Sequence, residues 1–390
     1  MLTSSIKFFN FKEKKNNKKV KKNLDGILKN KNKVIESLSK NYLYSFDKKK
    51  LDKYKKFSNF RVIGMGGSIL GTQTIYEFLN HKIKKNFIFS DNIQNTKNTK
   101  NTKNIKNRKK FINLVVSKSG NTIETIVNSN ILIKNNDKNI FITENKKNYL
   151  SLLAKKLKSE IIHHNNFIGG RYSVLSEVGM LPAELMGLNI NNFKQLNTLV
   201  KNKKFINSLI SNVSASLHYI KNNKFNSIII NYDEKSDSLF KWYQQLVAES
   251  LGKKNKGLLP IISTMPKDNH SVMQLYLDGF KNNFFTFFYV NENQSDKINN
   301  SNLIGSQKFL RDKKVSSIIY TQKKATENVF KKKNIPFRSF EIKKRDEKTL
   351  GEIFCFFVLE TILLAQLLKI NPYDQPAVEL IKKETKKILS

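Results

Sequence analysis

The segment FRVIGMGGSILG (residues 60–71) contains the repeating unit from which the fold is predicted. A short β-branched run ends at Ile63, glycines follow at once, and apolar residues recur at helical spacing from Ile69 onward. Strands that alternate with amphipathic helices indicate βαβ units and a parallel sheet covered on both faces. The first half is therefore expected to contain strands at 61–63, 87–89, 113–116, 140–143 and 161–162, and helices at 69–79, 123–133 and 149–157.

The same alternation resumes in the second half of the chain. It predicts helices at 205–220, 238–251, 270–279, 350–368 and 377–389, and strands at 227–231, 284–290, 315–320 and 337–342. The fold class is α/β, with two tandem three-layer α/β/α domains whose sheets are mainly parallel. The expected divisions are an N-terminal helical segment (1–56), a first domain (57–200), a second domain (201–345) and a C-terminal helical arm (346–390). Asn-Thr-Lys occurs three times in a row within 94–110, which predicts an exposed low-complexity insertion.

The strongly basic composition does not by itself indicate a nucleic-acid partner. The 390 residues have a formal net charge of +40, but 65 of the 71 basic residues are lysines and only six are arginines. Proteins that read nucleic acid rely on the bidentate and stacking contacts of Arg. Solvated lysines over most of the surface are therefore favoured over a nucleic-acid surface, and an Arg in this chain indicates a local reason for it.

The sequence predicts a cytoplasmic protein without a membrane segment. Its one cysteine, Cys355, cannot form an intramolecular disulfide, which fits a reducing compartment. Residues 1–9 are too short and too polar for a secretory signal. The apolar stretch 353–368 is interrupted by polar residues and is shorter than the ~20 residues of a membrane span. A buried core helix is expected there.

A second glycine-containing turn, SKSGNTIET (residues 117–125), also follows a strand and opens a helix. The hydroxyls of Ser117, Ser119 and Thr122 and the first amides of the helix could bind one phosphate group. Such a site suits a small phosphate monoester better than a polyphosphate. Capping of the helix by Thr122 is an alternative role, and the two roles are compatible.

Two further segments contain candidate catalytic residues. Arg171 follows two glycines in GGRYS (residues 169–173), and its permanently charged guanidinium could stabilise a developing oxyanion or form a structural ion pair. In WYQQLVAESLGK (residues 242–253), Gln245 and Glu249 are four residues apart and lie on one helix face. A carboxylate there is a candidate base, although an ordinary amphipathic helix would have the same pattern.

Taken in order, these segments resemble the phosphoglucose isomerase (glucose-6-phosphate isomerase) family, which pairs two sugar-isomerase (SIS) domains. The six matching blocks are GMGGSILG (64–71), SKSGNTIET (117–125), GGRYSVLSEVG (169–179), WYQQLVAESLGK (242–253), DNHSVMQLYLDGF (268–280) and NPYDQPAVELIKK (371–383). The resemblance implies reversible conversion of glucose 6-phosphate to fructose 6-phosphate through a cis-enediol. No metal or organic cofactor is implied.

The resemblance also implies a role for each matching residue. Glu249 is the expected base, Arg171 stabilises the enediolate, and His270 and Lys382 act in ring opening. The other implied contacts are Ser117, Ser119 and Thr122 to the phosphate, and Gly67, Ser68, Gly170, Gln245 and Gln375 to the sugar. By the same analogy the protein is a homodimer in which His270 completes the neighbouring active site. A non-catalytic sugar-phosphate-binding protein and, less favoured, a basic nucleic-acid-binding protein are the alternatives.

Overall fold

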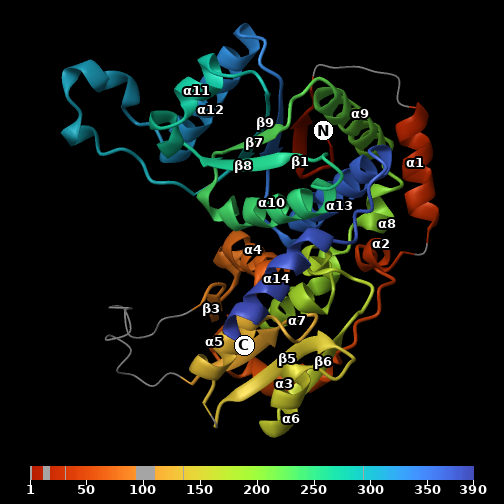
Figure 1. The fold of residues 1–390 in the computed structure, drawn as a ribbon. Helices are drawn as coiled ribbons and strands as arrows, with labels where there is room; N and C mark the ends of the chain where they lie inside the picture. Colours follow the sequence, from red (N-terminus) through yellow and green to blue (C-terminus); the bar gives the residue numbers. More distant parts are fainter. Residues whose placement is uncertain (1, 12–17, 31, 94–109, 135, 293) are drawn as a thin grey trace.

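The computed structural model describes residues 2–11, 18–30, 32–93, 110–134, 136–292 and 294–390. Two five-stranded sheets form separate halves of the molecule, with helices between them (Figure 1). The predicted α/β class with mainly parallel sheets is confirmed. Apart from Lys110, the expected insertion at 94–110 lies outside the described residues, and the predicted domain boundaries stay a prediction.

The first sheet has the strand order β3-β2-β4-β5-β6, and every neighbouring pair is parallel. Its strands are β2 (Asn59–Ile63), β3 (Asn86–Ser90), β4 (Ile112–Val116), β5 (Lys138–Glu144) and β6 (Glu160–His164). Its helices are α4 (Leu70–Phe78), α5 (Ile123–Leu132), α6 (Tyr149–Lys156) and α7 (Glu177–Leu185). Apolar residues on both faces of the strands pack against these helices, as expected for a parallel sheet buried on both sides.

The second sheet has the order β1-β10-β9-β7-β8 and is parallel except for β1, which pairs antiparallel with β10. Its strands are β1 (Ile6–Phe9), β7 (Asn226–Asn231), β8 (Leu259–Thr264), β9 (Asn283–Val290) and β10 (Phe337–Ile342). Alternate residues of β9 face opposite sides: Phe284 and Phe288 belong to the central core, whereas Phe285 and Phe287 pack towards α11 (Met273–Asp278) and α12 (Val315–Lys332).

Helices α4, α7, α10 (Asp237–Leu251) and α13 (Glu347–Leu367) contribute to one continuous core between the sheets. α13 passes a length and composition test for a membrane span, but 89% of its apolar window is buried inside the molecule. This burial confirms the predicted core helix. The remaining helices are α1 (Lys18–Lys29), α2 (Lys33–Ser37), α3 (Lys48–Lys55), α8 (Leu196–Leu199), α9 (Lys203–Lys221) and α14 (Pro376–Leu389).

Four details of the sequence-based prediction need correction. The strand expected at 315–320 is wrong, because these residues begin the 18-residue helix α12. Segment 1–56 is not helical throughout, since it also contains β1. Strand β8 was not predicted. The helix expected at 270–279 is two shorter elements, a 3₁₀ helix at Lys267–His270 and α11 at Met273–Asp278.

Candidate active site

Arg171 joins three segments that are distant in the sequence. It lies on the 3₁₀ helix η4 (Gly170–Leu175), and only 2% of its surface is exposed. Its Nε donates to Ser250 Oγ (2.9 Å), and its Nη1 donates to Glu249 Oε2 (3.0 Å) and Gln375 Oε1 (2.8 Å). Nη2 donates to the backbone oxygen of Pro372 (2.6 Å). The last turn of α10 and the loop before α14 are thereby attached to η4.

Glu249 uses its two carboxylate oxygens differently. Oε2 accepts from Arg171, and Oε1 accepts from Gln245 Nε2 at 2.9 Å, one helical turn earlier on α10. Its side chain is 29% exposed, whereas that of Arg171 is 1% exposed. The carboxylate is therefore oriented by two donors and remains accessible to a small molecule.

The first glycine turn packs directly against this group. A Cβ atom on Gly67 would lie 2.2 Å from the carbonyl carbon of Gly170, so only glycine fits there. Gly66 has a φ of +52°, and a Cβ on it would lie 2.8 Å from Gln245 Nε2. Ser68 ends the 3₁₀ helix η1 (Gly66–Ser68) beside them and is half-buried. The structure therefore brings Gly67, Gly170 and Gln245 together.

The three candidate phosphate-binding residues follow β4 and precede α5. Ser117 is buried, and its Oγ lies 2.9 Å from Thr122 Oγ1. Ser119 is exposed, and its Oγ accepts from the backbone N–H of Asn121 at 3.3 Å. Thr122 occupies the N-cap position of α5 but makes no side-chain capping bond, so its hydroxyl does not satisfy the helix amides.

Lys118 is a residue of this loop that the sequence analysis did not select. Burial lowers its pKa, Glu144 opposes this effect, and the positive charges of Lys146 and Arg171 add to it. The effect of Arg171 on this pKa indicates that Lys118 lies near enough to Arg171 for their charges to interact. In a chain with 65 lysines, the presence of a lysine at one position gives little indication of a functional role. Its position inside SKSGNT was the one feature that could have identified it.

Two predicted catalytic residues lie apart from this group. His270 is exposed at the end of its 3₁₀ helix and has no described contact with Arg171 or Glu249. Lys382 lies on α14, where its Nζ is 2.6 Å from Glu379 Oε1 and its side chain is 56% exposed. The structure of one chain therefore assembles Arg171, Glu249, Gln245 and Gln375, but not His270 or Lys382.

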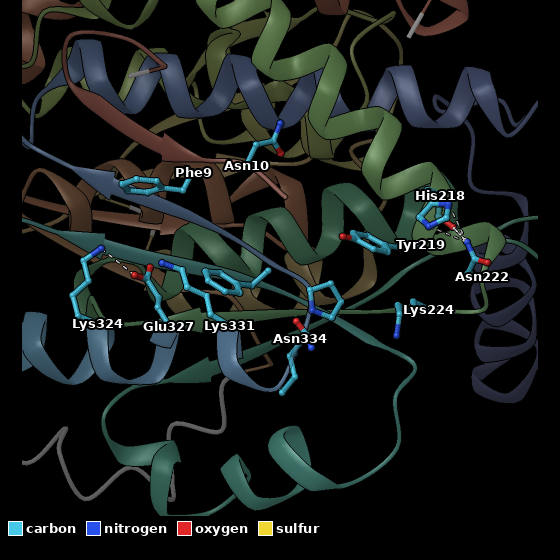
Figure 2. A pocket seen from close by; sticks show the side chains of 13 residues that line it. Phe9, Asn10, His218, Tyr219, Asn222, Lys224, Lys324, Glu327, Lys331 and Asn334 are labelled. Atoms are coloured by element: carbon cyan, nitrogen blue, oxygen red, sulfur yellow. Dashed lines mark hydrogen bonds and ion pairs between the residues drawn. The ribbon is translucent and has the colours of Figure 1, made fainter. Parts of the chain in front are cut away.

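A separate cavity of about 550 Å³ lies beside β1 and the ends of α9 and α12 (Figure 2). Aromatic and basic side chains line it, including Tyr219, Phe337 and Lys324, and Lys324 pairs with Glu327 across 3.0 Å. No predicted site residue lines it. No group of three metal-ligating side chains occurs anywhere in the described ranges.

Comparisons with known proteins show the family of the chain. The profile of the family described as Phosphoglucose isomerase matches residues 13–390. This chain belongs to the phosphoglucose isomerase family. Glucose-6-phosphate isomerase of Methanocaldococcus jannaschii is 33% identical over 348 residues, with 85% of each chain covered. The protein of the same name from Mycoplasmopsis pulmonis is 30% identical over 377 residues, with 88% of each covered. The predicted family resemblance is confirmed.

Solved structures show the fold of the phosphoglucose isomerase family in this chain. A hypothetical protein from Thermus thermophilus has a TM-score of 0.82, with 20% identity over 95% of this chain and 94% of that one. A glucose-6-phosphate isomerase from Chlamydia trachomatis has a TM-score of 0.68, with 19% identity over 88% of this chain and 72% of that one. At these identities the likeness concerns the fold alone.

Proposed function

We propose that this chain interconverts glucose 6-phosphate and fructose 6-phosphate, the activity for which its relatives are named. The observation that carries the proposal is the hydrogen-bonded pairing of Glu249 with Arg171. Aldose–ketose isomerisation needs one base next to the carbonyl and one fixed cation for the negative charge that develops on oxygen. The Glu249–Arg171 pair has both groups within one hydrogen bond of each other.

In the proposed reaction, Glu249 removes the proton from C2 of the open-chain aldose. The electrons of the C–H bond form the C1–C2 double bond, and the carbonyl oxygen becomes the enediolate oxygen, which is then protonated. The cis-enediol becomes the ketose when its C2 hydroxyl loses its proton and forms the C2 carbonyl, while the electrons of the C1–C2 double bond take the proton back from Glu249 at C1. The proton lost from the C2 oxygen balances the one gained by the C1 oxygen. Arg171 stabilises the enediolate, and because it is buried its charge is little screened by water.

Substrate binding is assigned to the turns around this pair. The phosphate contacts Ser117, Ser119 and Thr122, whose hydroxyls lie next to the free amides of α5. The sugar lies against Gly67, Ser68, Gly170, Gln245 and Gln375. The first glycine turn supports this assignment, because a Cβ on Gly66 would lie 2.8 Å from Gln245 Nε2, and its absence leaves room for the Gln245 side chain that donates to Glu249. The reaction as proposed uses no metal or organic cofactor.

Ring opening is assigned to His270 and Lys382, with His270 supplied by the second subunit of a homodimer. The exposure of His270 and its separation from Arg171 within one chain support this arrangement. A non-catalytic sugar-phosphate-binding protein would need the Ser117 turn but not a base oriented by both Arg171 and Gln245. The proposed location is the cytoplasm, and the proposed partner is a small sugar phosphate. Neither a membrane nor a nucleic acid is part of the proposal.

The test is turnover of fructose 6-phosphate to glucose 6-phosphate in a coupled assay containing a chelator. Glu249→Gln keeps the size of the side chain and removes its basicity, so kcat is expected to fall by ~10³-fold or more in a folded protein. Glu234→Gln, an exposed carboxylate outside the site, is the matched control and should keep wild-type kcat. A folded wild type without turnover that still binds the sugar phosphate would support the non-catalytic alternative.

A further inference from the structure

The described part of the chain buries two of its lysines, Lys194 and Lys323. Lys323 Nζ lies 2.8 Å from Glu327 Oε1 and 2.7 Å from Glu341 Oε1, so its charge is paired. Lys194 is 2% exposed and forms no ion pair with any described carboxylate; its Nζ donates to two backbone oxygens instead. Burial of an unpaired ammonium is unfavourable, and Lys194 therefore requires an explanation.

The two backbone oxygens belong to the ends of two short helices. Lys194 Nζ donates to the carbonyl oxygen of Ser37, the last residue of α2, and to that of Leu175, the last residue of η4. Carbonyls at a helix C-terminus lack intrahelical partners and carry partial negative charge. The ammonium satisfies both carbonyls and thereby fastens η4 to α2.

Aromatic rings complete the surroundings of the ammonium. The ring centroids of Tyr42 and Tyr44 each lie 4.8 Å from Lys194 Nζ, a distance typical of cation–π contacts. The titratable groups that face it are these two phenols, Glu177 on α7 and Cys355 on α13. Burial lowers the pKa of Lys194 to about 7, and the nearby Cys355 and Glu177 oppose the shift only in part.

Glu177 does not pair directly with Lys194, because other groups already occupy it. Its two oxygens accept from Tyr42 Oη at 2.9 and 3.1 Å, and Oε2 lies 3.6 Å from His164 Nδ1. Replacing Lys194 by an apolar side chain would leave the Ser37 and Leu175 carbonyls without their donor, so Lys194 contributes to the stability of this region. The same contacts hold one end of η4 in place.

η4 connects Lys194 to the site. This 3₁₀ helix has Arg171 in its first turn and Leu175 at its end, about 8 Å away at 2.0 Å per residue. Ser173 Oγ donates to the carbonyl oxygens of Gly170 (2.7 Å) and Gly67 (3.2 Å), which stiffens the turn between them. A shift of Leu175 would therefore be transmitted to Arg171.

We propose that Lys194 is a positioning residue for the isomerisation, which fixes η4 through the Leu175 carbonyl so that the Arg171 guanidinium meets the developing enediolate. Lys194 contacts neither Arg171 nor Glu249, and acts through the backbone of η4. The proposal rests on the role assigned to Arg171 under the proposed function.

The test compares kcat and KM of Lys194→Met with those of the wild type. A displaced Arg171 affects the charged transition state more than the bound substrate, so kcat is expected to fall roughly tenfold with KM changed less than about twofold. The midpoint of thermal unfolding should fall as well, because the Ser37 and Leu175 carbonyls lose their donor, so the split between kcat and KM and the double variant below decide the positioning role. Lys323→Met is the matched buried control: it should lower the unfolding midpoint, because it leaves Glu327 and Glu341 less paired, and keep wild-type kcat. If Lys194→Met does not fold, the same measurements are made on Lys194→Gln.

A double variant separates action through Arg171 from any other effect. If Lys194 acts through Arg171, Lys194→Met should reduce kcat little further in an Arg171→Lys background. Full additivity of the two losses, or wild-type kcat in Lys194→Met while Arg171→Lys is impaired, would overturn the positioning role alone. Wild-type kcat in Arg171→Lys would instead refute the role of Arg171 under the proposed function.

Discussion

Arg171 and Glu249 are 78 positions apart in the sequence, yet Arg171 Nη1 donates to Glu249 Oε2 at 3.0 Å. The arginine comes from the half of the molecule with the first sheet, and the glutamate comes from the helix that follows β7 of the second. Under the proposed function, their pairing makes the relative placement of the two halves a condition for catalysis. It also makes the residues that orient each partner the most informative sites for mutation.

Gln245→Leu should show how much of the activity depends on the orientation of Glu249, because the carboxylate itself stays in place. The substitution removes the 2.9 Å hydrogen bond to Glu249 Oε1 while it keeps the carboxylate and its contact with Arg171. We expect kcat to fall by about ten- to a hundredfold, because misplacement of a base costs rate without removing it. Steady-state kinetics checks this, with Gln244→Leu as the neighbouring control, since Gln244 bonds Pro260 and not the site. Equal kcat for the two variants would contradict it.

Gly67→Ala should be strongly harmful, whereas Gly26→Ala should not. A Cβ on Gly67 would lie 2.2 Å from Gly170, so η1 and η4 would have to separate, with an expected loss of about 2–3 kcal/mol in unfolding free energy and most of the activity. A Cβ on Gly26 in α1 meets nothing within 4 Å, and replacing a helix-interior glycine should stabilise by about 0.5–1 kcal/mol. Urea unfolding and turnover measure both; a stable, active Gly67→Ala variant would show that the contact relaxes freely.

The residues of the central pair, although not their contact, could be singled out because the sequence marks each of them locally. Arg171 is one of six arginines among 71 basic residues, and it follows two glycines in a chain with 15. Gln245 and Glu249 have the spacing of one helical turn, which the structure uses for a hydrogen bond. The contacts of Arg171 with Glu249 and of Gly67 with Gly170 could not be predicted, because they join residues 78 and about a hundred positions apart that no local pattern relates.

The wrong and missed elements each have a physical cause. The β-branched residues at 315–320 predict a strand, but they begin α12, and the helical pattern is hard to recognise because its buried residues include the charged Lys323 and Glu327. Pro260 in β8 argues against a strand, because proline has no backbone N–H to donate to a neighbouring strand. β8 is an edge strand of its sheet, where this missing N–H is tolerated. The four residues of β1 pair with β10 more than three hundred positions away, and no local pattern encodes that pairing.

Thr122→Val should weaken phosphate binding more than the chemical step. Thr122 Oγ1 lies 2.9 Å from Ser117 Oγ and does not cap α5, so removing the hydroxyl deletes a ligand contact without unwinding the helix. We expect KM to rise about five- to twentyfold, the equivalent of one hydrogen bond to a charged group, with kcat changed less. Thr361→Val on α13 is the control, because the Thr361 hydroxyl is buried and bonds the Phe357 carbonyl of its own helix, outside the site. An unchanged KM with a large fall in kcat would refute the phosphate role.

Acid should destabilise the protein partly through Glu341. Burial alone would raise the pKa of this carboxyl, but hydrogen bonds from Lys323 and Lys324 outweigh it and lower the pKa from 4.5 to about 2. Because the folded-state pKa is lower, the stabilisation is complete above pH 4.5 and is lost as the pH falls towards 2. Urea unfolding across this range should show a shallower loss for Glu341→Gln than for the wild type. Glu384→Gln, with a side chain 63% exposed, should keep the wild-type slope, and equal slopes for all three proteins would contradict the assignment.

Mixed dimers should show whether His270 acts across a subunit boundary. His270 is exposed and apart from the Arg171–Glu249 pair of its own chain, so a shared site predicts that Glu249→Gln and His270→Ala are each inactive alone. In a mixed dimer, one site would carry both substitutions and the other would be intact. Refolding or co-expressing the variants together should therefore restore about a quarter of wild-type activity, given random pairing in a two-fold dimer. If His270 acted within its own chain, every site of the mixture would lack either the base or the histidine, and no activity would return. Size-exclusion chromatography with light scattering supplies the control, since the restored activity should elute with the dimer.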